Sequence, residues 1–186
     1  MISGRPHVSY ETTYVLASIP SLALLTDERS WTYLRRPEDA KEEERLETLR
    51  KWQGQWDRST KGRWTHRLIP NIRESVERKH GEVNYQLIQL LFGHGYFKRH
   101  SQRYDKTINA QCPTCPHMVV DPEHVFFHCL RFDEERKRLN DHCQEEIRTE
   151  NIIGLMLTSE SNWQVVASFA HAVVTRLKNE EITRKR

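Results

Sequence analysis

Apolar residues recur at three- and four-residue intervals along most of this 186-residue chain, with charged residues between them. This is the period of an amphipathic helix, in which one stripe is buried and the rest faces water. The longest such segment opens at Pro37-Glu38-Asp39, a suitable helix start, and its predicted buried stripe is Leu46, Leu49, Trp52 or Gln53, and Trp56. The run Glu42-Glu43-Glu44 is expected to face solvent. No strand-like alternation of useful length occurs, so the pattern predicts a mainly α fold.

Further helices are predicted in the first half of the chain from capping residues and turn residues. Ser9 is expected to cap a helix that runs to about Ile19, and a second helix is expected over 22–33. Their expected apolar contacts are Val15, Leu16, Leu22, Leu25 and Leu34. Ser59–Gly62 predicts a turn, and a helix capped by Asn71 is expected to end at about Lys79, before Gly81.

The second half of the chain shows similar signals. Asn84 is expected to cap a helix that ends at Gly93-His94-Gly95 and has a wide apolar face: Tyr85, Leu87, Ile88, Leu91 and Phe92. Asp133 is expected to cap a helix with Leu139, Cys143 and Ile147 on one stripe. A short apolar segment follows over 152–157. Asn162 is expected to cap the final helix, whose core positions are Val165, Val166, Phe169, Val173 and Leu177.

The charge balance is nearly even, with 29 Lys and Arg against 26 Asp and Glu, but the distribution is not. Between Asp57 and Lys106 there are eleven basic and five acidic residues. The segment 63–67, Arg-Trp-Thr-His-Arg, interleaves basic and aromatic side chains, which suits phosphate contacts beside a stacking platform. Trp64 can equally anchor this segment in a core. The side chains predicted to contact nucleic acid are Lys61, Arg63, Arg67, Lys98, Arg99, Arg103 and Lys106.

Three of the four cysteines lie close together with a histidine, in the frame C-x2-C-x8-H-x4-C formed by Cys112, Cys115, His124 and Cys129. Two thiols separated by two residues can bind one ion from a tight turn, and a later His and Cys can complete a tetrahedron around Zn²⁺. Four protein ligands would close the site, so we expect a structural zinc ion. A disulfide framework is typical of short secreted chains rich in cysteine, and this chain is neither short nor cysteine-rich.

The ligand set has alternatives, because His117 and His128 lie nearby and Cys143 is a further thiol. Our choice is Cys112, Cys115, His124 and Cys129. Asp121-Pro122 is typical of a helix start, which puts His124 in the first turn of a short helix. On an ideal helix, residues five apart are offset by roughly 140° after one full turn. The helix must therefore end or unwind before Cys129 if both residues bind one ion.

Several motifs here are found together in one known family. They are Cys-Pro-x-Cys, Glu123–Phe127, Cys129, Arg131-Phe132 and Arg136, and upstream Trp52-Gln53, Trp56-Asp57, Ser59, Gly62–Thr65, Leu68–Pro70, His80–Val83 and Gly93–Gly95. In these the chain resembles the Cys/Cys/His/Cys zinc knuckle, and the segment before it, that follow the reverse transcriptase domain of insect non-LTR retrotransposons. It differs from the shorter gag-type knuckle in the wider spacing between the second Cys and the His.

The resemblance implies that the chain is a piece of a longer polyprotein. It implies RNA or DNA as partner, either the element's transcript or its target DNA, and contact with the reverse transcriptase domain. The family's paired polymerase aspartates and its endonuclease are not in this sequence, and motifs such as His-Glu-x-x-His are absent. We therefore expect this chain not to be an enzyme.

These observations predict four segments: N-terminal helices over 1–58, a basic helical segment over 59–110, the knuckle over 111–132 and C-terminal helices over 133–186. The predicted function is zinc-dependent nucleic-acid binding on behalf of a reverse transcriptase. The alternative is a protein–protein module that docks on the polymerase or another chain, with zinc only as a staple. The free thiols and the lack of a long apolar run predict an intracellular protein, in nucleus or cytoplasm, that does not enter membranes.

Overall fold

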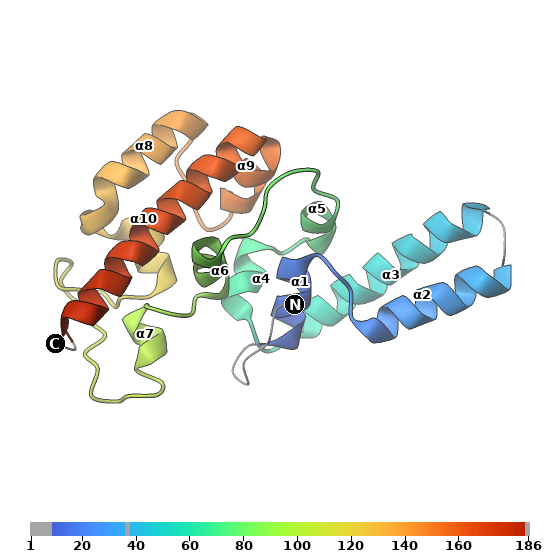
Figure 1. Cartoon of the computed structure of the whole chain (residues 1–186), viewed down its shortest axis with the longest axis horizontal. Coiled ribbons are helices and arrows are strands. Elements are labelled where there is room, and N and C mark those ends of the chain that lie inside the picture. The colour runs from blue at the N-terminus through green and yellow to red at the C-terminus, as the bar shows by residue number, and fades with distance from the viewer. Residues whose placement is uncertain (1–8, 36–37, 185–186) are drawn as a thin grey trace. The chain divides into compact units, whose positions relative to one another are not determined.

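The computed structural model describes residues 9–35 and 38–184, and these are mostly helical (Figure 1). Within these ranges no strand forms, although Gln111 and Val119 make one isolated antiparallel bridge. The mainly α fold predicted from the sequence is therefore confirmed. The chain divides into two units, Met1–Lys79 and His80–Arg186, while the finer four-segment division stays a prediction.

The first unit is built from short helices and one long helical hairpin. Its helices are α1 (Tyr10–Ala17), α2 (Leu22–Arg35), α3 (Glu38–Arg58), α4 (Arg63–Leu68) and α5 (Ile72–Val76). Helices α2 and α3 run antiparallel along each other, and α5 contacts both α1 and α3 (Figure 1). The predicted caps Ser9 and Asn71 are confirmed, because their side chains accept hydrogen bonds from the first turns of α1 and α5.

Trp56, which is fully buried, lies in the core of the first unit. Its indole N–H donates to the carbonyl of Ile69 at 2.8 Å. Gln53 fixes the same loop, because its side chain donates to the carbonyl of Pro70 and accepts from the backbone N–H of Ile72. The surrounding buried side chains include Val15, Leu16, Leu24, Leu49, Trp52 and Leu68.

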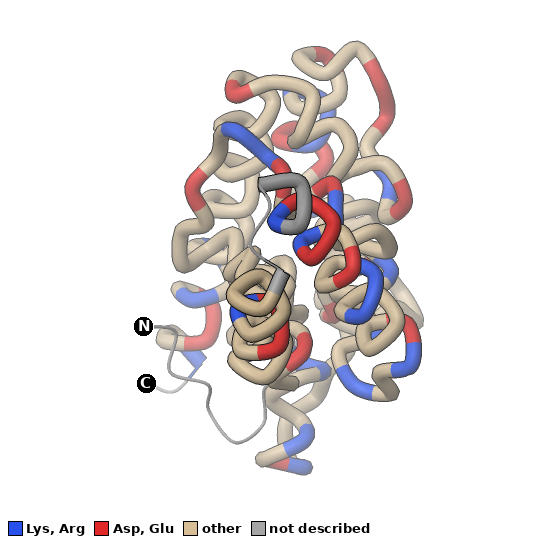
Figure 2. Tube along the Cα trace, turned by 90° about the vertical axis from the view of Figure 1, so that its right-hand side faces the viewer, with Lys and Arg blue, Asp and Glu red and all other residues tan. Residues whose placement is uncertain are grey.

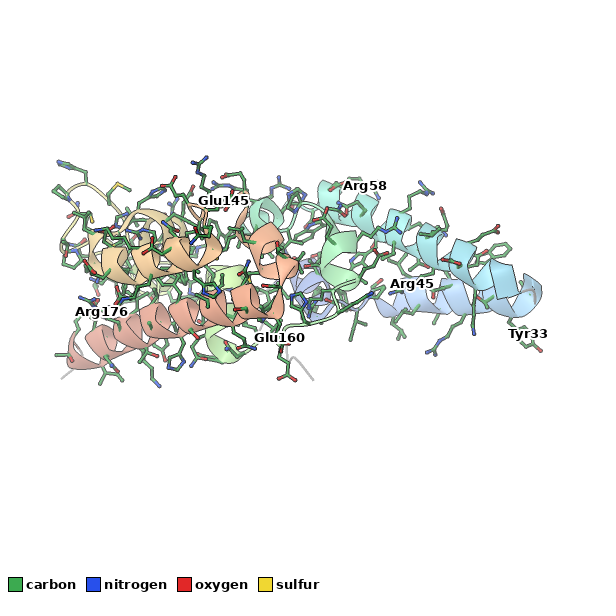
Figure 3. All side chains as sticks on the ribbon, turned by 90° about the horizontal axis from the view of Figure 1, so that it is seen from above. Tyr33, Arg45, Arg58, Glu145, Glu160 and Arg176 are labelled. Carbon is green, nitrogen blue, oxygen red and sulfur yellow. The ribbon has the colours of Figure 1, made fainter. Side chains whose placement is uncertain are left out.

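Some burial predictions for the hairpin were wrong. Leu22, Leu34 and Leu46 are 73%, 71% and 44% exposed, whereas Glu44, predicted to face solvent, is buried. Two packed helices bury only part of their surface, and in this hairpin Leu24 and Leu49 are among the buried side chains. The side chain of Tyr33 points away from the hairpin (Figure 3). The predicted helix start at Pro37 lies outside the described residues.

The second unit packs around its last helix. Its elements are α6 (Tyr85–Phe92), α7 (Lys98–Ser101), the π-helical turn η1 (His124–His128), the 3-10 turn η2 (Leu130–Phe132), α8 (Asp133–Cys143), α9 (Ile152–Thr158) and α10 (Glu160–Arg184). Helix α10 contacts α6, α8, α9 and η1 (Figure 1). The predicted core positions of α10 are buried at Val166, Phe169, Val173 and Leu177, while Val165 is half-buried.

Helix boundaries in the second unit agree with the sequence at some points and not at others. Asn84 caps α6 as predicted, with its side chain accepting from Leu87 N–H at 2.9 Å, but Tyr85 is 57% exposed and so lies off the apolar face. Ser159, not Asn162, caps α10, because its hydroxyl accepts the backbone N–H of Asn162. Asp133 is the first residue of α8 and not its cap.

Glycine is needed at position 81. Gly81 has φ +87°, and an added Cβ would overlap the indole of Trp163. Trp163 in turn donates its indole N–H to the carbonyl of Glu82 at 3.0 Å. This close approach holds the start of the second unit against α10. No helix in the described part of the chain is long and apolar enough to cross a membrane.

Candidate metal centre

The first two candidate ligands lie on a tight turn between Ala110 and Val120. Two backbone hydrogen bonds close it, from Cys112 N–H to the carbonyl of Met118 (2.7 Å) and from Val120 N–H to that of Ala110 (2.8 Å). Cys112 and Cys115 are both buried. The turn therefore directs two thiols toward the interior of the second unit.

The other two candidate ligands come from the next turn of the chain. The carboxylate of Asp121 accepts a hydrogen bond from His124 N–H at 2.9 Å and so caps a short helical segment. That segment widens into the π-helical turn η1, in which Cys129 N–H donates to the carbonyl of His124 at 2.7 Å. The backbone is extended at Cys129, with φ −68° and ψ 125°. The prediction that the helix unwinds before Cys129 is confirmed.

These two turns bring together one ligand atom from each of Cys112, Cys115, His124 and Cys129, all within 4.8 Å of one another. The Sγ atom of Cys129 lies 3.8 Å from that of Cys112 and 4.0 Å from that of Cys115. All four side chains are buried. Such a group can hold a metal ion.

The alternative ligands lie outside this cluster. His117 and His128 are exposed, and Cys143 is half-buried at the end of α8. Among the described residues, the four clustered side chains form the group of His, Cys, Asp or Glu that is arranged to hold an ion. That they bind metal stays a prediction.

His124 gives an independent indication. It is only 3% exposed, yet within the described part of the chain neither ring nitrogen makes a hydrogen bond of regular geometry. Buried polar atoms are nearly always paired, because an unpaired one costs about 1–3 kcal/mol. A metal ion bound by one ring nitrogen would remove part of this cost. The surroundings of His124 therefore fit a metal ligand.

The thiols differ in their tendency to ionise. Burial opposes ionisation of Cys112, but hydrogen bonds that include the backbone amides of Thr114 and Cys115 outweigh it and lower the pKa of this thiol to about 6. Burial raises the pKa of Cys129, and a hydrogen bond from Arg131 offsets this in part. Neighbouring thiolates repel each other, so a cation is needed before all three can ionise together.

Arg131 supports the cluster from outside. Its Nε–H donates to the Sγ atom of Cys129 at 3.4 Å, and its Nη1 contacts both carboxylate oxygens of Glu180 on α10 at 2.7 and 2.9 Å. The Arg131 side chain is 6% exposed. Arg176, which extends from α10 (Figure 3), donates to the backbone carbonyl of Arg131 at 2.9 Å. The cluster is thus tied to the last turns of α10.

Arg136 fixes the backbone beside the same cysteine. This buried side chain on α8 donates to the carbonyls of Phe126 (3.2 Å) and Cys129 (3.0 Å). Sequence reasoning used Arg131 and Arg136 only as marks of resemblance and gave neither a role at the site. The available signal was their position two and seven residues after Cys129.

The seven basic residues predicted to contact nucleic acid divide between the units: Lys61, Arg63 and Arg67 in the first, and Lys98, Arg99, Arg103 and Lys106 in the second. Lys98 is half-buried and the others are exposed. Figure 2 shows basic and acidic residues interspersed along the described chain. The predicted strip is therefore two groups, one on each unit.

Two of these residues also make structural contacts. Arg99 forms a 2.9 Å ion pair with Asp121, the residue that caps the turn carrying His124. Arg67 lies over the ring of Trp64, 5.8 Å from its centroid, as in a cation–π contact. Trp64 is half-buried, so part of its ring stays accessible.

Comparison with known proteins gives one relative. Over 94 residues, 50% of this chain, the sequence is 29% identical to a retrovirus-related Pol polyprotein from the type-1 retrotransposable element R1 of Popillia japonica. The match covers 36% of that polyprotein, so the chain spans only part of its relative. No protein-family model matches the chain, and no solved structure does. The match confirms the resemblance predicted from the motifs: the chain is similar to a region of a non-LTR retrotransposon polyprotein.

Proposed function

We propose that this chain is a zinc-stabilised, nucleic-acid-binding region that follows the reverse transcriptase domain of a non-LTR retrotransposon polyprotein, acts inside the cell and catalyses no reaction itself. The observation that carries this proposal is the buried Cys112/Cys115/His124/Cys129 cluster, in a chain similar to a retrotransposon Pol polyprotein. Three buried thiols beside a buried imidazole whose ring nitrogens make no regular hydrogen bond are poorly explained as ordinary core.

Zinc fits this donor set. Thiolate and imidazole are the ligands that Zn²⁺ takes in structural sites, whereas Mg²⁺ and Ca²⁺ take oxygen ligands. With Zn–S bonds near 2.3 Å, two sulfurs on a regular tetrahedron lie roughly 3.8 Å apart. The Sγ atom of Cys129 lies at 3.8 and 4.0 Å from those of Cys112 and Cys115. Four protein ligands would leave no position for water, so the ion would stabilise the fold and not activate a nucleophile.

The zinc centre would also position the basic group of the second unit. The backbone N–H of Arg99 donates to the carbonyl of Val120 at 3.2 Å, and its side chain pairs with Asp121. The segment that carries Lys98, Arg99 and Arg103 is thus attached to the turn between the two halves of the cluster. Its exposed side chains would contact phosphates of RNA or DNA.

Zinc binding is tested by native mass spectrometry of the reduced chain, in which we expect one zinc ion per molecule. Cys115→Ser removes a ligand and should abolish tight binding, whereas Cys143→Ser removes the thiol outside the cluster and should retain the ion. A reduced wild-type chain that takes up no zinc when it is supplied would contradict the proposal.

Nucleic-acid binding is tested by titration of RNA and DNA at several salt concentrations. Arg103→Ala combined with Lys106→Ala should weaken binding and lower the log–log salt slope by roughly 0.7–0.9 for each lost phosphate contact. The control removes the same two charges elsewhere on the second unit, through Arg138→Ala and Lys178→Ala, both exposed. Equal loss of affinity in the two double variants would show that binding depends on net charge and not on the position of Arg103 and Lys106.

A second candidate function is docking on the reverse transcriptase domain, with zinc only as a staple. The observation in its favour is the set of apolar residues that α2 leaves exposed: Leu22, Trp31, Tyr33 and Leu34. An apolar dock is nearly insensitive to salt, whereas phosphate binding weakens steeply as salt rises. A salt-insensitive complex with the polymerase, together with no affinity for RNA or DNA, would favour this second function.

A further inference from the structure

Four aromatic rings of the second unit follow one another in a continuous series. The ring centroids of Phe92 and His94 lie 5.9 Å apart and those of His94 and His100 4.3 Å apart, and both pairs are stacked with 23° between their planes. His100 then meets Tyr104 edge-on at 5.4 Å. The first three side chains are half-buried, and Tyr104, at the end of the series, is 57% exposed.

The backbone around Gly93-His94-Gly95 makes this series possible. Helix α6 ends with Gly93 in the left-handed region, and Gly95 has φ +90°. A side chain at Gly95 would also overlap the Gln89 amide. This reversal lets His94 turn back onto the next segment, where the buried Phe97 anchors α7. The Gly-His-Gly sequence therefore not only ends α6 but also places the His94 ring in the series.

Cations flank the exposed end of the series. Arg103 and Lys106 are both exposed and lie within two residues of Tyr104. The intervening Asp105 uses one carboxylate oxygen to accept the backbone N–H of Thr107 at 3.0 Å and its hydroxyl at 2.6 Å, as in a turn. An accessible ring with exposed cations close to it in the sequence can hold a single strand, with a base on the ring and phosphates on the cations.

We infer that Tyr104, supported by the His100–His94–Phe92 series, is a stacking platform for an unpaired base, so that the second unit prefers single-stranded RNA or DNA to duplex. The inference rests on the proposed nucleic-acid binding and makes it specific. A duplex hides the faces of its bases inside the helix, whereas a single strand can present them to an aromatic side chain. Arg103 and Lys106 would then hold the phosphates on either side.

The test compares three DNA ligands of equal length: a single strand, its duplex, and an abasic strand that keeps the phosphates but lacks bases. Wild-type protein should bind the single strand more tightly than the other two. Tyr104→Ala should weaken single-strand binding by about 5- to 150-fold, the range found for one lost stack. The same variant should leave duplex and abasic binding unchanged, whereas Tyr104→Phe keeps the ring and should bind like wild type.

Tyr85→Ala is the matched control, because Tyr85 lies in the same unit with the same 57% exposure but outside the ring series. If wild-type protein binds nucleic acid while Tyr104→Ala and Tyr85→Ala bind the single strand equally well, the stacking platform is wrong and the proposed function stands. If wild-type protein binds none of the three ligands and no RNA strand of the same length, the proposed function fails and this inference with it.

Discussion

The α2–α3 hairpin and the knuckle over 112–132 hold their side chains in place by different means. The hairpin has helices of 14 and 21 residues, yet it leaves Leu22 and Leu34 largely exposed. The knuckle has turns of only five and three residues, yet Val125, Phe126 and Cys129 are fully buried. Length of regular structure is therefore a poor guide to burial in this chain.

The two regions differ in the interactions that stabilise them. Long helices supply their own backbone hydrogen bonds, and apolar packing needs only to hold two of them together. The knuckle has few such bonds and relies on side chains from distant parts of the chain, as in the pairing of Arg131 with Glu180. On this account the knuckle depends on a metal ion and its polar supports, and the hairpin depends on neither.

Removal of the metal should give the largest effect and the sharpest contrast. A strong chelator should abolish protection from hydrogen exchange over 112–132, because apparent zinc-binding free energies of about 10–16 kcal/mol are typical of small structural sites. Protection over 45–56 in α3 should not change. Hydrogen exchange with mass spectrometry resolves both peptides in one experiment, and parallel loss in both would contradict the comparison.

Within the hairpin, replacement of two leucines three residues apart should lower the stability of the protein by different amounts. Leu49→Ala should cost about 2–5 kcal/mol, because Leu49 is 6% exposed, while Leu46→Ala should stay within about 0.5 kcal/mol at 44% exposure. Urea denaturation of each variant measures this difference, with zinc content as a control that should not change. Similar costs for both would show that the hairpin buries a different face.

Replacement of Arg131 tests whether this side chain supports zinc binding in the knuckle. Arg131→Ala should lower zinc affinity by about 10- to 100-fold, as expected when a supporting partner of a ligand is lost. Lysine cannot reproduce the guanidinium that contacts both Cys129 and Glu180, so Arg131→Lys should recover little. Competition with a chelator measures the affinity, and Arg138→Ala, an exposed arginine on α8, is the control.

A small effect on stability is expected at the ion pair of Arg99 and Asp121. Arg99→Ala should change stability by about 0–1 kcal/mol, as is usual for an exposed pair. Asp121→Ala should cost more, about 0.5–2 kcal/mol, because it also removes the cap on His124 N–H. Denaturation of the zinc-loaded variants gives the order, and a larger loss for Arg99→Ala would contradict it.

Local features of the fold could be predicted from the sequence. Ser9, Asn71 and Asn84 cap their helices because a cap depends only on residues within one turn. The unwinding before Cys129 followed from geometry alone, once both residues were required to reach one ion. The mainly α fold followed from periodicity. Each of these rests on interactions between neighbours in sequence.

Features that depend on distant partners could not be predicted. Periodicity marked Leu46 as buried and Leu34 was expected to make apolar contacts, but which turns of a hairpin are covered depends on other helices. The contact between Arg131 and Glu180 joins residues 49 positions apart, and no local sequence pattern predicts it. The ring series from Phe92 to Tyr104 likewise needed the reversal at Gly95, which the sequence suggested only as a helix stop.

We propose that Cys112, Cys115, His124 and Cys129 bind one zinc ion, and histidine variants distinguish this ligand set from the alternatives. Zinc affinity is measured by competition with a chromophoric chelator for His124→Ala, His117→Ala and His128→Ala. We predict a loss of orders of magnitude for His124→Ala, because it removes a buried ligand, and little change for the two exposed histidines. Full retention of zinc by His124→Ala would contradict the account.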